Sequence, residues 1–487
     1  MLGVLASCNN TSGPLSGLTT TEAPKTPVAS DEDRKAALKR VAVDLEKQKK
    51  QLKQVAAADQ QKPTEINVAK LRPAVTTNTS LLSPKTVIQP GKLKPVPGSK
   101  FGVDENETVA SIPRLDSIQN KSGPLGRFHA KLSALKSGDR KKPITILHIG
   151  DSHVASDSFT RGIRNALQAR YGDAGRGMVI PARAFKYGVA DQVTLKAVGN
   201  WRSQTALKRK SGRFGLSGVN VSSRSSRSSM VMKSKTGPFD WAEVTVATGP
   251  SQGAFFMKVG TTEKRFDAFS KSRGSKNFRI DARGRSLTIR PGGGAQTTIL
   301  NWSSGKNRVG IRYINFGLIG ATVDITRRFD TKLLENDVRR LDPDLIIYGY
   351  GTNEGFNDNL NLSAYSKRAK RFVNTLRASA PNADIVYLGA ASGLRRKGNK
   401  ACGGWSVPPK LAPLRANIRK IAEVQKAAYW DWSSIMGGAC GVNAWAKKGL
   451  AAKDRVHLSS KGYRLSAKEF ANWLMRPAAS NVRIASN

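Results

Sequence analysis

Ser152 and the distant pair Asp454 and His457 could together perform nucleophilic catalysis. Ser152 follows Gly150-Asp151, and Asp454 stands three residues before His457. A serine hydroxyl is a weak nucleophile until a neighbouring base removes its proton. His457 can be that base, while Asp454 can hold the imidazole in the required tautomer and stabilise the imidazolium. The residue types therefore predict a Ser-His-Asp triad.

Attack by a serine on a carbonyl also creates an oxyanion, which needs hydrogen-bond donors already in place. Three donors are available near the predicted triad: the Ser152 backbone N–H, the Gly320 backbone N–H and the Asn353 side-chain amide. A glycine at position 320 lets the backbone approach a substrate closely. We expect these three groups to form an oxyanion hole.

Four polar residues are candidate substrate contacts: Asp151, His153 and Glu354, which adjoin these positions, and Arg176, which lies farther along the chain. Asp151 could instead orient its turn by accepting hydrogen bonds from nearby N–H groups. Arg176, in Gly175-Arg176-Gly177, could face an anionic substrate or lie in an ordinary loop after a helix. No cluster of His, Cys, Asp and Glu has the spacing of metal ligands, so we expect neither a metal nor another cofactor.

The elements that must position these residues are strands alternating with helices. Apolar, β-branched runs predict strands at 144–149, 309–316, 345–350, 384–388 and 427–431. Helical periodicity predicts helices at 158–171, 327–340, 363–378, 411–424 and 460–474. This alternation is typical of a doubly wound α/β fold with a five-stranded, flavodoxin-like parallel sheet. Active sites of such sheets lie beyond the carboxyl ends of the strands, where the segments described above fall.

The α/β pattern is interrupted, and the chain divides into three regions. Residues 197–305 are rich in Gly, Ser, Arg and Lys and contain short alternating runs at 242–247, 254–259, 286–289 and 297–300, which predict an all-β insert. The α/β domain is thus split into 111–196 and 306–478. Residues 1–110 are rich in Ser, Thr, Pro, Lys and Gln, a composition that favours a disordered, basic linker.

Four segments together resemble the sequence blocks of SGNH (GDSL-like) hydrolases, in the same order. They are Gly150-Asp151-Ser152, Gly320, Gly351-Thr352-Asn353 and Asp454-x-x-His457. The resemblance covers roughly residues 144–474 without the insert. It implies an SGNH-type serine carbohydrate esterase with the roles derived above.

A narrower resemblance concerns the first block. The run from His148 to His153, followed by Gly172-Asp173-Ala174-Gly175-Arg176-Gly177, is similar to the opening of periplasmic peptidoglycan O-acetylesterases. Those proteins also carry a β-rich, carbohydrate-binding-like insert between the first and second blocks. The sequence departs from many relatives at Glu354, where they have Asp after the Asn.

The charge of the chain indicates its partners. The net charge is +46 and the isoelectric point is about 10.6, so the chain is drawn to polyanions. No zinc-finger, RNP-like or basic-helix motif is present, so we expect no specific nucleic-acid binding. The expected partner is an anionic cell-envelope glycan, namely peptidoglycan. No apolar run is long enough to predict a transmembrane helix.

The three cysteines bear on the compartment. Cys8 ends the segment Leu5-Ala6-Ser7-Cys8, which resembles a bacterial lipobox, and a polar region follows it. Only Met1 to Ser7 precede Cys8, which is shorter than a signal peptide, so either the start codon is assigned too late or the match is chance. We expect a truncated lipoprotein signal, a lipid anchor through Cys8 and a location in the periplasm or cell envelope. Cys402 and Cys440 would pair there, whereas in the cytoplasm they would be buried free thiols.

Three functions remain open on this basis. The leading hypothesis is an exported esterase that removes O-acetyl groups from an envelope glycan, through an acetyl-enzyme on Ser152. A second is an esterase or acetyltransferase acting on another exported polysaccharide. A third is a non-catalytic, basic cell-wall-binding protein that retains the fold.

Overall fold

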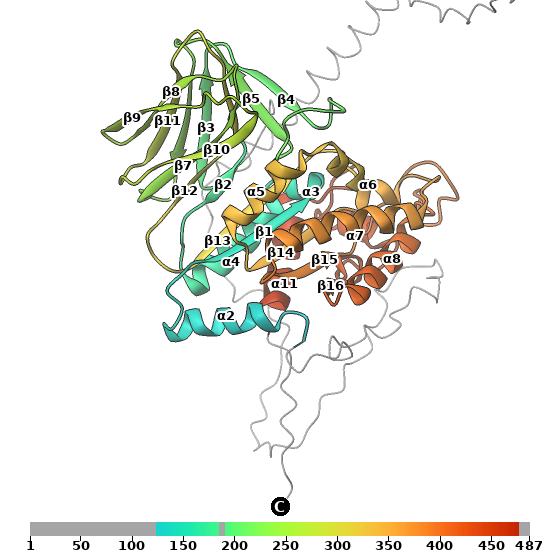
Figure 1. Ribbon diagram of the computed structural model, residues 1–487. Coiled ribbons are helices and arrows are strands. Elements are labelled where there is room, and N and C mark those ends of the chain that lie inside the picture. Colours follow the sequence, from blue (N-terminus) through green and yellow to red (C-terminus); the bar gives the residue numbers. More distant parts are fainter. Residues whose placement is uncertain (1–122, 185–189, 477–487) are drawn as a thin grey trace, which may run out of the picture. The chain divides into compact units, whose positions relative to one another are not determined.

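The computed structural model describes residues 123–184 and 190–476, and its centre is a five-stranded parallel sheet (Figure 1). The strands are β1 (Ile144–Gly150), β13 (Ile311–Gly317), β14 (Leu345–Gly349), β15 (Asp384–Leu388) and β16 (Ala428–Trp430). Their order is β13-β1-β14-β15-β16, with every pair parallel. This order confirms the doubly wound α/β fold, and its switch point lies between β1 and β14.

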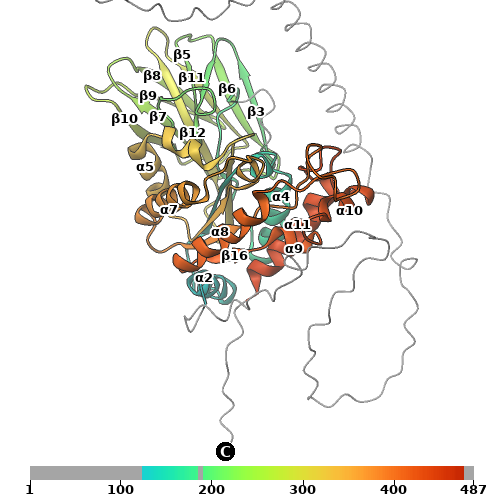
Figure 2. The same ribbon diagram turned by 90° about the vertical axis from the view of Figure 1, so that its right-hand side faces the viewer.

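Helices cover both faces of this sheet, so its strands are buried on both sides. Every residue of β1 is buried. Leu147 and Ile149 belong to the core beneath α5, α7 and α8, whereas Ile144 and Ile146 belong to the core beneath α2, α4 and α11 (Figures 1 and 2). The covering helices are α2 (Gly126–Ser137), α4 (Ser158–Tyr171), α5 (Thr331–Leu341), α7 (Leu362–Ser379), α8 (Leu411–Val424) and α11 (Ser460–Met475). The short helices are α3 (Ser152–Ala155), α6 (Thr352–Gly355), α9 (Trp432–Ile435) and α10 (Gly441–Lys447).

One helix begins later than the sequence indicates. We expected a helix from residue 327, but Val323–Arg328 forms a 3-10 helix and α5 starts only at Thr331. Asp330 explains the start, because its side chain accepts a hydrogen bond from the Leu333 backbone N–H at 3.1 Å.

Between β1 and β13 the chain forms two antiparallel sheets. One has the order β10-β7-β12-β5-β4 with β2 paired to β12, and the other has the order β3-β6-β11-β8-β9. Their strands are β2 (Gly177–Val179), β3 (Val193–Val198), β4 (Arg202–Thr205), β5 (Val219–Ser223), β6 (Ser229–Ser234), β7 (Trp241–Thr248), β8 (Ala254–Val259), β9 (Thr262–Asp267), β10 (Gly274–Ile280), β11 (Ser286–Pro291) and β12 (Thr297–Gly305). The β-rich insert is therefore present, and β2 and β3 extend it to the N-terminal side of residue 197.

The expectations for the N-terminal region and for the cysteines have different outcomes. The linker at 1–110 and Cys8 lie outside the residues that the structure describes. Cys402 and Cys440 form a disulfide with a Cα–Cα distance of 5.3 Å. Among the described helices, none is both long and apolar enough to cross a bilayer.

Candidate active site

Ser152 stands at the point where β1 ends and the one-turn helix α3 begins. The Asp151 carboxylate caps this helix by accepting a hydrogen bond from the His153 backbone N–H at 3.0 Å. Gly317, at the end of β13, lies so close that a Cβ there would collide with the backbone of Asp151 and Ala155. The turn is thus held from two sides, with the Ser152 side chain near the surface and 9% of the residue exposed.

His457 and Asp454 reach Ser152 from the loop before α11. The Ser152 Oγ lies 2.9 Å from His457 Nε2, and His457 Nδ1 lies 2.7 Å from Asp454 Oδ2. The other carboxylate oxygen of Asp454 accepts hydrogen bonds from the backbone N–H groups of Val456 and His457, at 2.9 and 3.0 Å. Asp454 therefore fixes both the loop and the imidazole. With Nδ1 protonated, Nε2 is free to accept the serine proton.

The charges of this pair favour such a hydrogen-bond chain. Burial would raise the pKa of Asp454, but hydrogen bonds from His457 and Val456 outweigh it and lower the pKa to about 2. The hydrogen bond with Asp454 raises the pKa of His457 above its ordinary value of 6.5, despite partial burial. Asp454 thus stays ionised at neutral pH and stabilises a proton on His457.

The three expected oxyanion donors lie on the segments after β1, β13 and β14. The backbone N–H groups of Ser152 and Gly320 make no hydrogen bond to any described residue. The Asn353 amide donates one hydrogen bond, to the Ala321 carbonyl at 2.8 Å, which leaves its second N–H available. Gly320 is exposed, with a φ of +74° that favours glycine. These three groups thus each have an N–H available, and their service as an oxyanion hole stays a prediction.

The four candidate substrate contacts are buried, and Asp151 takes the alternative role considered for it, which is to orient its turn. Asp151, His153, Arg176 and Glu354 are each at most 5% exposed, so none presents its side chain to a ligand in this conformation. Arg176 donates to Asn315 Oδ1 at 2.8 Å and to the carbonyls of Tyr313 and Asp191. Its guanidinium is thus used inside the fold, and a contact between Arg176 and a substrate stays an untested prediction.

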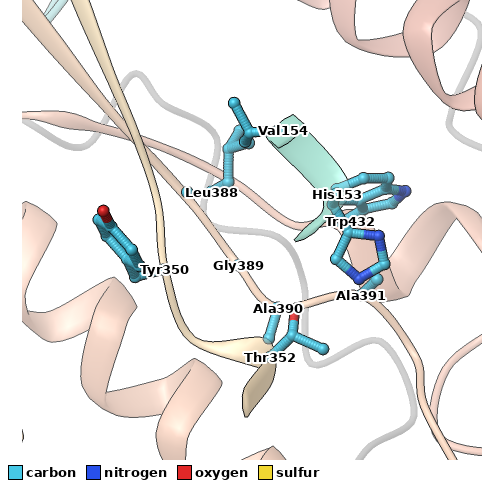
Figure 3. A pocket seen from close by; sticks show the side chains of 10 residues that line it. His153, Val154, Tyr350, Thr352, Leu388, Gly389, Ala390, Ala391 and Trp432 are labelled. Atoms are coloured by element: carbon cyan, nitrogen blue, oxygen red, sulfur yellow. The ribbon is translucent and has the colours of Figure 1, made fainter. Parts of the chain in front are cut away.

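His153 packs behind the site. Its Nδ1 lies 2.9 Å from the Tyr463 hydroxyl, and its ring lies 5.2 Å from the Trp432 ring and 5.4 Å from the His457 ring. Figure 3 shows the rings of His153 and Trp432 side by side. Burial lowers the pKa of His153 to about 3, so the ring is neutral at physiological pH. The histidine beside the serine therefore supports His457 as an uncharged packing neighbour. Sequence reasoning missed the contact between His153 and Tyr463, although Tyr463 lies on α11, only six residues after His457.

Glu354 links two of the functional segments. Its Oε1 accepts a hydrogen bond from the Val323 backbone N–H at 2.6 Å, and burial raises its pKa to about 8. Val323 follows directly on the loop that carries Gly320 and Ala321, and the neighbouring Asn353 bonds to Ala321. The adjacent residues Asn353 and Glu354 thus both hold the Gly320 loop. Sequence reasoning missed this link, because it depends on burial of a carboxyl group.

No metal site is apparent in the part of the chain that the structure describes. No three or more His, Cys, Asp or Glu side chains gather there in an arrangement that could hold a metal ion.

Comparison with known proteins agrees with this geometry. The GDSL-like Lipase/Acylhydrolase family matches residues 284–465, a range that includes Gly320, Asn353, Asp454 and His457 but not Ser152. A solved structure of a peptidoglycan O-acetylesterase is 29% identical to the chain, with a TM-score of 0.65, over 73% of this chain and 97% of its own. These two matches support an SGNH-type esterase.

Other solved structures are less similar to this chain. A family two carbohydrate esterase from Cellvibrio japonicus is 12% identical over 58% of this chain and 97% of its own, with a TM-score of 0.25. A GDSL-like lipase from Bacteroides thetaiotaomicron is 18% identical over 33% of this chain and 75% of its own, also with a TM-score of 0.25. No curated protein matches the chain.

Proposed function

We propose that this esterase removes O-acetyl groups from a cell-envelope glycan, namely peptidoglycan, with Ser152, His457 and Asp454 as its catalytic triad. The observation that carries the proposal is the continuous hydrogen-bond chain of 2.9 Å from Ser152 to His457 and 2.7 Å from His457 to Asp454. These distances fall within the range expected for a nucleophile, its base and the group that orients the base.

The proposed reaction has two steps. Ser152 Oγ attacks the acetyl carbonyl carbon while its proton moves to His457 Nε2, and the oxyanion binds to N–H groups of Ser152, Gly320 and Asn353. The bond between the acetyl carbon and the sugar oxygen then breaks, and His457 gives its proton to that oxygen, which departs as a sugar hydroxyl. Water next attacks acetyl-Ser152 with His457 as base, which releases acetate and restores the serine.

Two observations support the choice of substrate. The solved structure that matches the chain with a TM-score of 0.65 is a peptidoglycan O-acetylesterase, and the match covers 97% of that protein's own length. The net charge of +46 would concentrate the esterase on an anionic wall polymer. We therefore also propose a location in the cell envelope, with a lipid anchor at Cys8 as a part of that proposal.

The experiment is acetate release by the full-length protein from O-acetylated peptidoglycan, with Ser152→Ala as the matched variant. We expect release by the wild type and none above background by the variant, with unchanged circular dichroism. O-acetylated xylan tested in parallel addresses the second hypothesis. Faster acetate release from xylan than from peptidoglycan would contradict the peptidoglycan proposal. Acetate release from neither substrate would favour a non-catalytic wall-binding protein.

A further inference from the structure

A polar hollow of about 210 Å³ lies on the insert, remote in sequence from the triad. It is lined by residues of β4, β5 and β12, of the loop between β4 and β5, of the loop after β7, and of the segments before β10 and β12. The lining residues are Arg202, Gln204, Arg213, Asn220, Ser222, Gly249, Ser251, Gln252, Arg273, Gln296 and Thr298. Pockets that enclose a drug-sized ligand measure roughly 300–1,000 Å³, so this hollow suits one residue of a longer chain.

The floor of the hollow is a row of polar side chains across three neighbouring strands. Arg202 on β4 pairs in register with Ser222 on β5, which pairs with Thr298 on β12. Alternate residues of a strand point to opposite faces, and the intervening Val221 and Ile299 are fully buried in the core. One face of this sheet is therefore apolar and packed, while the other presents hydroxyl, amide and guanidinium groups together.

The hollow is positively charged. Three arginines line it, and none of its described lining residues is acidic. Arg202 and Arg273 form no ion pair with any described residue. Arg213 donates hydrogen bonds to the carbonyls of Thr248 and Gly274. Burial lowers the pKa of Arg213, the charge of Asp330 opposes this, and the charge of Arg273 adds to it. Two guanidinium groups thus remain free to bind an anion.

A buried amide adds an independent sign of a ligand. Gln252 is only 5% exposed, and its Oε1 has no hydrogen-bond partner. Its Nε2 makes one long contact, of 3.5 Å, with the Ser251 hydroxyl. A buried polar atom without a partner is costly, so such an atom in the wall of a polar hollow is suited to a donor brought by a ligand.

We infer that this hollow binds a carboxylate-bearing sugar residue of an acidic polysaccharide. The carboxylate pairs with Arg202 and Arg273, because guanidinium groups match carboxylates in geometry and charge. Sugar hydroxyls bond to the side chains of Ser222, Gln252 and Thr298. No aromatic side chain is among the described lining residues. Binding of single-stranded nucleic acid commonly relies on aromatic stacking, which makes it the less suitable ligand.

This site deepens the proposed function without depending on its chemistry. Binding of an acidic sugar requires neither Ser152 nor His457. That the bound polymer is also the polymer deacetylated at Ser152 rests on the proposed function. The hollow would then hold a wall chain beside the esterase and raise its activity on polymer, but not on a small soluble ester.

Binding is tested with the full chain carrying Ser152→Ala and with polygalacturonate as the probe, at fixed ionic strength. We expect Arg202→Gln combined with Arg273→Gln to weaken the affinity roughly tenfold or more. Arg265→Gln combined with Arg285→Gln is the matched control, because it removes the same charge from exposed arginines of the insert that do not line the hollow. We expect this control to change the affinity less than twofold.

Equal weakening by both pairs of substitutions would overturn the inference, since it would mean attraction by net charge alone. An equal effect of the hollow pair on single-stranded DNA would overturn it as well, because the site would then not be selective for acidic sugar. With Ser152 restored, the hollow pair should hydrolyse a soluble aryl acetate at the wild-type rate but release less acetate from O-acetylated peptidoglycan. Loss of both activities would contradict a site separate from catalysis.

Discussion

At the scale of single residues, the site is a set of hydrogen bonds in which each partner fixes the next. Asp454 binds its own loop through two backbone N–H groups and His457 through the imidazole. The imidazole in turn meets Ser152. Because this chain is short and continuous, loss of one member should impair the chemistry far more than the stability of the fold.

Replacement of Asp454 by Asn tests that chain. His457 must be neutral to accept a proton, so activity falls as the pH falls through its pKa, which Asp454 raises above 6.5. Asp454→Asn should reduce kcat roughly 10⁴-fold and move the acidic limb of the pH–rate profile to lower pH. Acetate release measured across pH checks both effects. Asp281→Asn, at an exposed residue of the insert, is the control, and an unmoved acidic limb would contradict the role of Asp454.

Glu354 is a positioning residue for the Gly320 loop. Glu354→Ala leaves the buried Val323 N–H without its acceptor and should lower kcat roughly tenfold with little change in KM. Glu354→Gln keeps an acceptor oxygen and should restore the rate.

Glu354 should also make the stability of the fold depend on pH. Because its pKa is raised to about 8 in the folded protein, stability is lost as the pH rises from about 4.5 to about 8. Denaturation measured across this pH range should therefore show the free energy of unfolding falling more for the wild type than for Glu354→Gln. An equal pH dependence of the two proteins would argue against a buried carboxyl group at Glu354.

At the scale of elements, strand ends and one close backbone approach position the nucleophile. Gly317 lets the end of β13 pass against the turn between β1 and α3, where a Cβ would meet the backbone of Asp151 and Ala155. Neighbouring strands thus determine where Ser152 lies as much as its own strand does.

Gly317→Ala should therefore shift α3 and destabilise the fold by roughly 1–3 kcal/mol, since backbone cannot move aside as a side chain can. The rate of acetate release should fall as well, because Ser152 moves relative to His457. Gly274→Ala, at the start of β10, is the comparison, because a Cβ there meets only the Thr248 hydroxyl within 4 Å. If both variants retained the wild-type rate, the close approach would have no role in positioning Ser152.

Buried strands could be predicted from the sequence more readily than exposed ones. The strands of the parallel sheet were predictable because burial on both faces gives continuous apolar runs, as in β1 and β15. Strand β9, with the sequence TEKRFD and little burial, carries no such signal. The same contrast holds for the site. Spacing brought out Asp454 and His457, whereas the inward turn of Arg176 depends on distant partners such as Asn315.

At the scale of the whole molecule, the insert and the α/β domain share one core. Buried residues of the insert, such as Trp302, belong to the same hydrophobic cluster as Val338 of α5. Asp337 on α5 adds polar links, since it accepts hydrogen bonds from the Leu216 backbone N–H and the Asn301 amide, both at 3.1 Å. We expect the described part of the chain to unfold as one cooperative unit.

Asp337→Ala tests this coupling. It leaves two buried donors of the insert without an acceptor and should lower the free energy of unfolding by roughly 2–4 kcal/mol. Glu335→Ala, on the outer side of the same helix, should change it by less than about 0.5 kcal/mol. Thermal unfolding followed by calorimetry should give one transition in each variant. Two separate transitions in the wild type would contradict a shared core.

The most direct measurement of the central claim is covalent labelling of the folded protein with a fluorophosphonate, which reacts with serines activated by a neighbouring base. Mass spectrometry of the intact chain should show a single adduct, and peptide mapping should locate it at Ser152. Labelling should be abolished in Ser152→Ala and strongly slowed in His457→Ala. An unlabelled wild type, or an adduct on another serine, would contradict Ser152 as the nucleophile of this esterase.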